Sequence, residues 1–194
     1  MHSLFLDTFL AAFSGVAKIG LIVVVAGLLI RRRVLGQEHI RALSVSVVYV
    51  FLPCLIFSNI TSILHPEEFP LWWMVPLFAL AIATLGMGLA ALLFLRELPH
   101  KQHMIPLSSL QNAGYLVLPI GQFLVPESFE LFALFTFLFI LAHNPILWSI
   151  GKHLTTSGAG DGFDWKSFLT VPFLANLVAL AVVEPELFGL KHLP

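Results

Sequence analysis

The chain has 194 residues, of which 58% are hydrophobic and 11% are charged, and its formal net charge is −1. So few polar side chains cannot cover the surface of a water-soluble globule, which excludes a soluble fold and predicts a protein of the lipid bilayer. The sequence contains no basic patch, so nucleic acid is not an expected partner.

Six segments are apolar over lengths that cross, or nearly cross, a bilayer, for which a helix needs about 20 residues. We therefore predict an all-α integral membrane protein with about six transmembrane helices, of which the last is short. The single cysteine, Cys54, excludes an internal disulfide. The expected spans are residues 9–30, 43–64, 71–95, 104–125, 131–151 and 167–183.

The positively charged residues follow alternate spans. Eight of the ten Lys and Arg residues lie in the connections after the first, third and fifth spans, including the run Arg31, Arg32 and Arg33. The connections after the second and fourth spans carry none. By the positive-inside rule, the basic connections, with the Arg31 to Arg33 loop among them, are cytoplasmic and both termini lie outside. The expected location is the cell membrane, which the chain crosses several times.

The first span carries one charged residue, Lys18, near its middle. A bare ammonium group is costly at that depth, so an intramembrane lysine usually faces a cavity, a partner or the bundle interior. Two interpretations stay open. Lys18 either meets an anionic substrate, or extends its amine outward to the interface or to backbone carbonyl groups.

The second span has Pro53 near its centre. Proline lacks a backbone N–H, and its ring obstructs the preceding helical turn. The second span is therefore expected to be an interrupted helix.

The fourth span contains a polar stretch at membrane depth, residues 108–121, in which Gln111 and Asn112 are followed by Gly114 and Pro119. We expect the helix to break from Gly114 to Pro119, because broken backbone survives in hydrocarbon where it is buried in protein or lines a wet cavity. Discontinuous helices of this kind mark substrate sites in secondary transporters. The alternative is a proline kink, with both amides bonding to neighbouring helices.

The fifth span contains a third intramembrane proline, Pro145, preceded by His143 and Asn144. A further helix interruption is expected there. His143 either relays protons or, as the neutral form, donates to a neighbouring carbonyl group. We expect Asn144 to hydrogen-bond to another helix.

An enzyme is not expected. An intramembrane enzyme needs a nucleophile and a base within hydrogen-bond reach, and His143 has no obvious Ser or Cys partner in the sequence. The scattered histidines lack the spacing of zinc ligands, and neither a phosphate-binding glycine loop nor a nucleophile elbow occurs. We therefore expect no catalytic residues, no metal and no cofactor.

Two segments near the start of the chain stand at a short spacing, Gly27-Leu-Leu-Ile-Arg-Arg-Arg-Val-Leu-Gly36 and Phe51-Leu-Pro-Cys-Leu-Ile-Phe57. They resemble the glycine-containing first helix, basic turn and Leu-Pro-x-Leu-Ile-Phe run of the auxin efflux carrier family of membrane permeases. Asn112, followed seven residues later by Pro119, is similar to that family's broken fourth helix. The resemblance extends over roughly residues 10–183, and the order and spacing of the motifs make it specific.

The resemblance implies two five-helix repeats of opposite topology, joined by a cytoplasmic loop, with the broken fourth helix as a crossover. It implies a first repeat over residues 1–151, a linker over residues 152–166, and the first helix of an incomplete second repeat over residues 167–194. The Gly- and Ser-rich residues 155–162 suit such a linker. On this basis we expect a second polypeptide as a partner that supplies the missing repeat.

The leading interpretation is a secondary carrier that moves a small organic anion, a carboxylate, by alternating access at the broken helix. The resemblance implies that Asn112 and Pro119 lie at the substrate site, to which we add Gln111, Gly114 and Lys18. The alternative is a half-length membrane protein that does not transport, but assembles with or regulates other membrane subunits.

Overall fold

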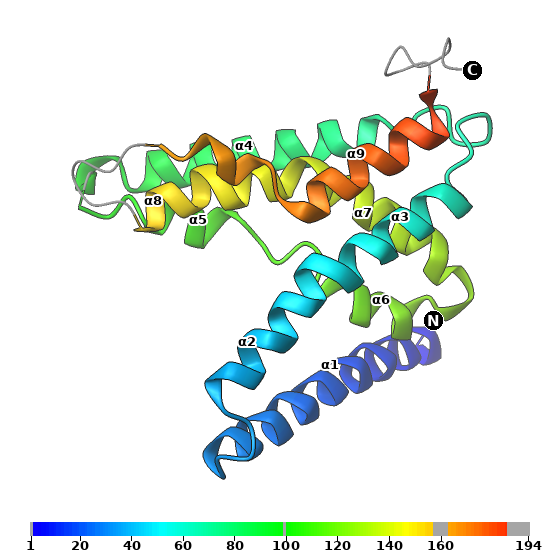
Figure 1. Ribbon diagram of the computed structural model, residues 1–194, viewed down its shortest axis with the longest axis horizontal. Coiled ribbons are helices and arrows are strands. Elements are labelled where there is room, and N and C mark those ends of the chain that lie inside the picture. Colours follow the sequence, from blue (N-terminus) through cyan, green and yellow to red (C-terminus); the bar gives the residue numbers. More distant parts are fainter. Residues whose placement is uncertain (1, 99, 157–162, 186–194) are drawn as a thin grey trace.

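The computed structural model describes residues 2–98, 100–156 and 163–185 (Figure 1). Within these ranges every regular element is a helix, which confirms the prediction of an all-α membrane protein. Residues 157–162, in the expected linker, and residues 186–194, in the expected tail, lie outside the described ranges.

Four of the expected spans form helical stretches that are long and apolar enough to cross a membrane, counted over the described residues. The first and third are single helices, α1 (His2–Arg31) and α4 (Met74–Leu93). The second and fifth are composite, and each contains a π-helical turn. Their parts are α2 (Gln37–Ser46), η1 (Val47–Phe51) and α3 (Leu52–Ile63) for the second, and η3 (Pro126–Ser128), α7 (Phe129–Ile146), η4 (Leu147–Gly151) and α8 (Lys152–Thr156) for the fifth.

The fourth expected span is divided. It consists of α5 (Met104–Ser109) and α6 (Val117–Leu124), and residues 110–116 between them are not helical, so the predicted break is present. The sixth span is α9 (Val171–Val183). Its 13 residues rise about 20 Å, less than the roughly 30 Å of a hydrocarbon core. Two 3-10 turns, η2 (Leu95–Glu97) and η5 (Trp165–Phe168), lie in the connections.

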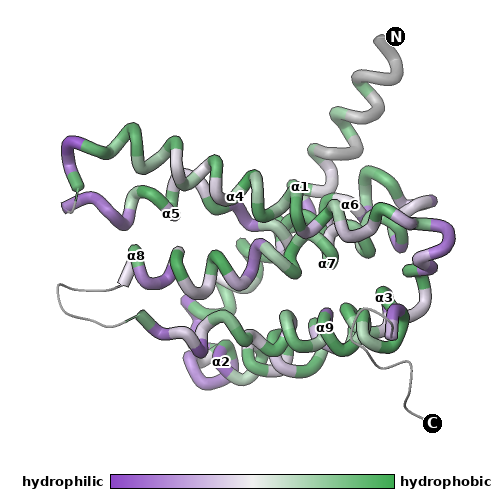
Figure 2. The backbone as a smooth tube through the Cα atoms, turned by 90° about the horizontal axis from the view of Figure 1, so that it is seen from above, coloured by the Kyte–Doolittle hydropathy of each residue, from purple (hydrophilic) through white to green (hydrophobic). Residues whose placement is uncertain are grey.

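The central element is α7. Figure 2 shows it between α4 on one side and the pair α3 and α9 on the other. On the α4 side the buried residues are alanines, whose small side chains allow neighbouring helices to approach closely. On the other side the apolar core consists of Ile56, Ile60, Leu64, Trp72, Ala133, Leu134, Phe137, Leu138, Ile140, Ala179 and Leu180.

The second half of the broken span, α6, packs against both α7 and α1. Glycine permits both contacts. A Cβ added at Gly121 would lie 2.1 Å from Phe132 Cε1 on α7, and one added at Gly15 of α1 would lie 2.9 Å from Phe123 Cδ2 on α6. Because real atoms do not approach so closely, any larger residue at Gly121 would displace α6 from α7.

The connections with most of the positive charge gather at one end of the molecule. In Figure 1 the turns after α1 and α4, and the end of α8, lie at the left, whereas the turns after α3 and α6 lie at the right. The left-hand turns carry Arg31, Arg32, Arg33 and Lys101, and Lys152 lies at the start of α8. The fold therefore places the basic connections on a common side, as the alternating pattern in the sequence predicted.

The interruptions expected at Pro53 and Pro145 are corrected by the structure, because both helical rods continue past the proline. A π-helical turn lies next to each one: η1 directly precedes α3, which contains Pro53, and η4 follows shortly after Pro145. In η1 the Leu52 N–H donates to the Val47 carbonyl group five residues back. A proline ring obstructs the turn that precedes it, so at Pro53 the wider turn η1 takes up the misfit. At Pro145 the wider turn η4 comes after the proline, and α7 itself continues through it.

Candidate functional site

The break between α5 and α6 is closed at both ends by defined hydrogen bonds. At the end of α5, Leu110 becomes extended (φ −98°, ψ 113°) while its N–H donates to the Pro106 carbonyl group at 2.9 Å. At the start of α6, the Leu116 N–H donates to Asn112 Oδ1 at 3.3 Å. Leu116 is the N-cap residue of α6, so this bond from Asn112 holds the chain directly before the helix begins.

Between these two ends the backbone has free donors. No described residue accepts a hydrogen bond from the N–H groups of residues 111–115. At membrane depth an unsatisfied N–H costs several kcal/mol unless it meets water, protein or a ligand. A run of such donors is therefore expected to face a hydrated or ligand-filled space.

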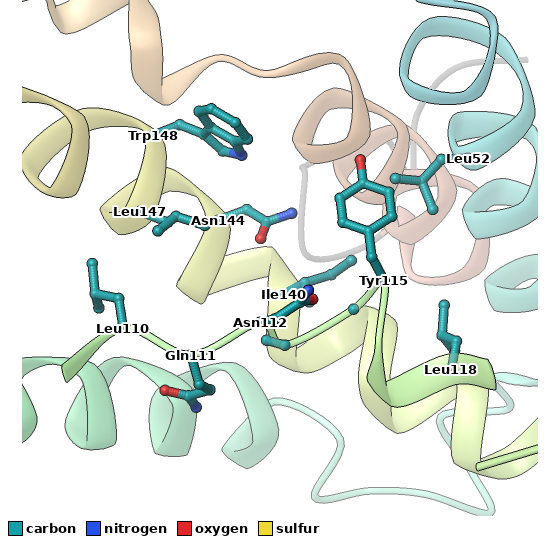
Figure 3. A pocket seen from close by; sticks show the side chains of 12 residues that line it. Leu52, Leu110, Gln111, Asn112, Tyr115, Leu118, Ile140, Asn144, Leu147 and Trp148 are labelled. Atoms are coloured by element: carbon teal, nitrogen blue, oxygen red, sulfur yellow. The ribbon is translucent and has the colours of Figure 1, made fainter. Parts of the chain in front are cut away.

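A pocket of about 300 Å³ lies beside the break (Figure 3). Its walls come from the break itself, from α7 and η4 of the fifth span, and from the start of α3. None of the described residues that line it is charged. They are Leu52, Leu110, Gln111, Asn112, Ala113, Gly114, Tyr115, Leu118, Ile140, Asn144, Leu147 and Trp148.

The two ends of the Asn112 amide have different tasks. Its Oδ1 accepts from the Leu116 N–H, whereas its Nδ2 donates to no described residue. An amide NH₂ group has two hydrogens to donate, so Asn112 is able to bind an acceptor in the pocket while it keeps the bond from Leu116. The structure thus places Asn112 at the break and in the pocket wall.

The other residues predicted at the break have unequal positions. Gln111 and Gly114 line the pocket, although in Figure 3 the Gln111 side chain is directed away from Asn144. Pro119 is not among the described lining residues. It is the third residue of α6, where the missing N–H leaves no gap in the helix. The expectation that the broken backbone reaches Pro119 is therefore corrected, since the break ends at residue 116.

Lys18 does not line this pocket. Its ammonium nitrogen lies 4.2 Å from the centroid of the Phe123 ring on α6. Attraction between a cation and the face of an aromatic ring stabilises such an arrangement. In the structure, Lys18 therefore links α1 to the second half of the broken span.

Three side chains project together into the space above the break in Figure 3: Tyr115 from the break, Asn144 from α7 and Trp148 from η4. Asn144 makes no hydrogen bond to another helix within the described residues, and the interhelical bond expected of it stays a prediction. Instead, its amide faces the pocket. The neighbouring His143 is fully buried against Phe139, with ring centroids 5.7 Å apart, and no described carbonyl group accepts from its ring nitrogens.

A second pocket, of about 390 Å³, adjoins the first. The two share Tyr115, Asn144 and Trp148, which therefore form the boundary between them. Two cationic side chains line the second pocket, Lys152 at the start of α8 and Lys166 in η5. It lies toward the basic end of the molecule.

The sequence contains a pattern from which two of the additional pocket-lining residues, Trp148 and Lys152, could have been predicted. Trp148 and Lys152 follow Asn144 at intervals of four residues, a spacing that places side chains along one face of a continuous helix. The interruption expected at Pro145 hides this signal, because it separates Asn144 from the residues that follow. Tyr115 has no comparable signal, since its position depends on the path of the non-helical backbone.

A family model described as membrane transport protein matches residues 11–163 of the chain. The matched region contains the break, the fifth span and most of the first span. No curated protein and no solved structure matches the chain.

Proposed function

Since the chain belongs to the membrane transport protein family, we propose that it is a secondary carrier for a small organic anion whose carboxylate binds at the break between α5 and α6. The observation that carries this proposal is the run of free backbone N–H groups at residues 111–115 beside the free Nδ2 of Asn112. Together they are hydrogen-bond donors at membrane depth that have no acceptor among the described residues.

An anion suits these donors better than a neutral acceptor. Hydrogen bonds to a charged group contribute about 1.5–3 kcal/mol each, roughly twice the value for neutral pairs. No acidic side chain is among the described residues that line the pocket, so a carboxylate would meet no like charge there. The donors at the break thus favour a carboxylate.

The rest of the pocket suits an apolar body of limited size. Leu52, Leu118 and Ile140 contribute hydrocarbon, and the volume of about 300 Å³ is at the lower end of the usual range for ligand pockets. The substrate class we propose is therefore a small carboxylic acid with an apolar portion.

We place alternating access at the same break. A third pocket, of about 560 Å³, lies toward the opposite end of the bundle, shares Leu118 with the first, and includes Asn59, Gln122 and Glu130 in its lining. A tilt of α6 about residues 110–116 would close one side of the site as the other opens. No continuous helix needs to unwind for this movement.

The basic connections are proposed to face the cytoplasm, with the chain in the cell membrane and both termini outside. Replacing Cys54 with Ser leaves a background without thiols, into which Arg33→Cys or Glu127→Cys introduces one reporter each. In intact cells, a membrane-impermeant thiol reagent should label the Glu127 variant and spare the Arg33 variant. The reverse labelling pattern would contradict the proposed orientation.

The test of function is carboxylate binding to the purified chain in lipid nanodiscs, measured by calorimetry. The probes are acetate, benzoate and succinate, each compared with its neutral amide. For the carboxylate that binds tightest, Asn112→Ala should raise Kd by about 10- to 100-fold, as expected for the loss of one charge-assisted hydrogen bond. Gln122→Ala, an amide on α6 outside the pocket at the break, is the matched control and should leave Kd unchanged.

A second variant separates the NH₂ donor of Asn112 from its oxygen, which accepts from Leu116. Asn112→Asp keeps an oxygen for the Leu116 N–H, but it replaces the NH₂ donor with an anionic or protonated carboxyl group. Carboxylate binding should be lost while helix content is retained. Unchanged affinity in both Asn112 variants would show that the site is assigned wrongly. A wild-type chain that binds none of the carboxylates would favour the alternative of a non-transporting subunit, and saturable uptake in liposomes tests whether this chain transports without a partner.

A further inference from the structure

The second pocket holds positive charge that carboxylate binding at the break does not use. Lys152 and Lys166 are the charged residues among those described in its lining, and no acidic residue of the lining opposes them. Ser167 and Thr170 add hydroxyl groups. Because this pocket shares three side chains with the pocket at the break, an anion held between the lysines is already next to the proposed substrate site.

Lys152 has a weak internal partner. Its Nζ lies 3.8 Å from Asp164 Oδ2 and donates to Ser167 Oγ at 3.4 Å. Both members of the ion pair are about half exposed, so water screens their attraction. The Ser167 hydroxyl donates to Asp164 at 2.7 Å and lowers the pKa of that carboxyl group, so Asp164 is anionic at neutral pH. The Lys166 side chain forms no ion pair with a described residue.

Aromatic packing positions both lysines. Phe163 contacts His153 on α8 and Trp165 in η5, with ring centroids 5.3 Å and 4.7 Å apart respectively. His153 follows Lys152 directly, and Lys166 follows Trp165 directly. The rings therefore hold the two cations near each other, although they are 14 residues apart in the sequence.

We propose that Lys152 and Lys166 recruit the substrate carboxylate from the aqueous side before it reaches the break, and that Asp164 is an internal carboxylate which the ligand displaces from Lys152. This inference rests on the proposed function. It concerns a different step, because the lysines set how fast the anion arrives whereas the donors at the break set how tightly it is held.

The physical basis is electrostatic steering. Charges of one sign lining a concave surface raise the local concentration of the opposite ion and increase association rates by roughly 10- to 1,000-fold. A ligand carboxylate at Lys152 replaces one screened ion pair with another, so displacing Asp164 costs little. The Debye length shrinks from about 10 Å in 0.1 M salt to about 3 Å in 1 M salt, so high salt should remove the effect.

The structure provides an optical reporter for the experiment. Trp148 lines both pockets, so the full-length chain with all four tryptophans is itself the reporter, and the part of the signal that Trp148→Phe removes belongs to this residue. Stopped-flow mixing of this full-length reporter in nanodiscs with benzoate then gives association and dissociation rate constants. Benzamide serves as the neutral probe of similar shape.

The double variant Lys152→Gln, Lys166→Gln should lower the association rate constant for benzoate by roughly tenfold in low salt, the lower end of the range for electrostatic steering. Its dissociation rate constant should stay within about twofold of wild type, and the difference in association should vanish in 1 M salt. Asp164→Asn, which frees Lys152, should raise the association rate constant. The control is Lys101→Gln, which removes an exposed lysine that pairs with Glu97 and does not line the pocket.

Two failures are distinguishable. Equal association rate constants for wild type and the double variant, or an equal loss in the Lys101 control, would overturn recruitment by Lys152 and Lys166 while leaving carboxylate binding intact. A wild-type reporter with neither a fluorescence change nor a calorimetric signal for benzoate, acetate or succinate would overturn the proposed function itself.

Discussion

The fourth and fifth spans each contain a proline and an asparagine at membrane depth, but only the fourth leaves the helix. In the fourth span, Asn112 accepts from the Leu116 N–H directly before α6 begins, and the N–H groups of residues 111–115 donate to no described residue. In the fifth span, the helix passes Pro145 and continues through the π-helical turn η4, where the Ser149 hydroxyl donates to the Pro145 carbonyl group.

The difference lies in whether the helix continues past the proline. The fifth span stays helical through Pro145 and η4, so it serves as a continuous wall that presents Asn144 and Trp148 to the pocket. The fourth span is closed at both ends but open between them, so it supplies donors. A proline is therefore a poor indicator of a break in this protein.

The largest effect is expected where these two spans touch. Gly121→Leu would insert a side chain where even a Cβ would lie 2.1 Å from the Phe132 ring. Overpacking of this kind costs about 1–3 kcal/mol or more. We expect the free energy of unfolding to fall by about 3 kcal/mol, and benzoate binding to be lost because α6 shifts away from α7. Thermal unfolding in detergent, with and without benzoate, measures both.

Gly88→Leu is the matched control, because nothing lies within 4 Å of a Cβ added there. It should leave stability nearly unchanged. Adding Phe132→Ala to the Gly121→Leu variant should restore part of the loss by making room for the leucine. Equal stability of the Gly121 and Gly88 variants would contradict the close packing of the broken span on α7.

Hydropathy predicted most of the helices because a membrane span is dictated by a local property, about 20 successive apolar residues. The break was also predictable in kind, since Gln111, Asn112 and Gly114 mark it in the sequence. The residues at which the break ends were not predictable, because the sequence around a proline does not show whether the proline ends one helix or stands in the first turn of the next. Pro119 stands in the first turn of α6.

The rest of the site depends on tertiary structure. The presence of both Tyr115 and Trp148 in the pocket wall requires the path of the break and the course of the fifth span through η4, neither of which a local pattern specifies. Lys18 was expected to meet substrate or to reach outward, yet the packing of α1 on α6 puts it over Phe123. Lys152 and Lys166 line the same pocket, where aromatic contacts of η5 position them, and a hydropathy profile does not show such contacts.

The same substitution at Pro53 and at Pro119 is expected to have smaller and unequal effects on stability. Pro53→Ala restores a backbone donor inside a helix that now accommodates the ring with a π-helical turn, so we expect a gain of about 1 kcal/mol in the free energy of unfolding. Pro119→Ala acts in a first helical turn, where the donor is not required, and should change stability by less than about 0.5 kcal/mol. Titration with a denaturing detergent, followed by circular dichroism, compares the two.

Pro53→Ala should also alter the second pocket, because η1 presents Tyr49 to it. The expected change is a few-fold shift in the association rate constant for benzoate with little change in the dissociation rate constant. Similar stability changes at both prolines would mean that the π-helical turn is not what accommodates Pro53.

The smallest effect is expected from Asp164, outside both spans. The hydrogen bond from Ser167 lowers the pKa of this carboxyl group below its ordinary value of 3.8 in the folded protein. The ionised form therefore favours folding, and its contribution is present above that pH and is lost as the pH falls through the lowered pKa. Asp164→Asn should lower the unfolding temperature slightly at pH 7, by an amount that shrinks as the pH falls through the lowered pKa. A difference that grows on acidification would contradict this assignment.

The central claim is that the free N–H groups of the break hold a carboxylate. Amide proton shifts of the ¹⁵N-labelled chain in nanodiscs, recorded with benzoate and with benzamide, test it most directly. With benzoate, downfield shifts are expected at residues 111–115 and at the Asn112 side-chain amide, and benzamide should produce at most a small fraction of them. Benzoate binding that leaves these amides unshifted, or shifts them no more than benzamide does, would contradict the claim.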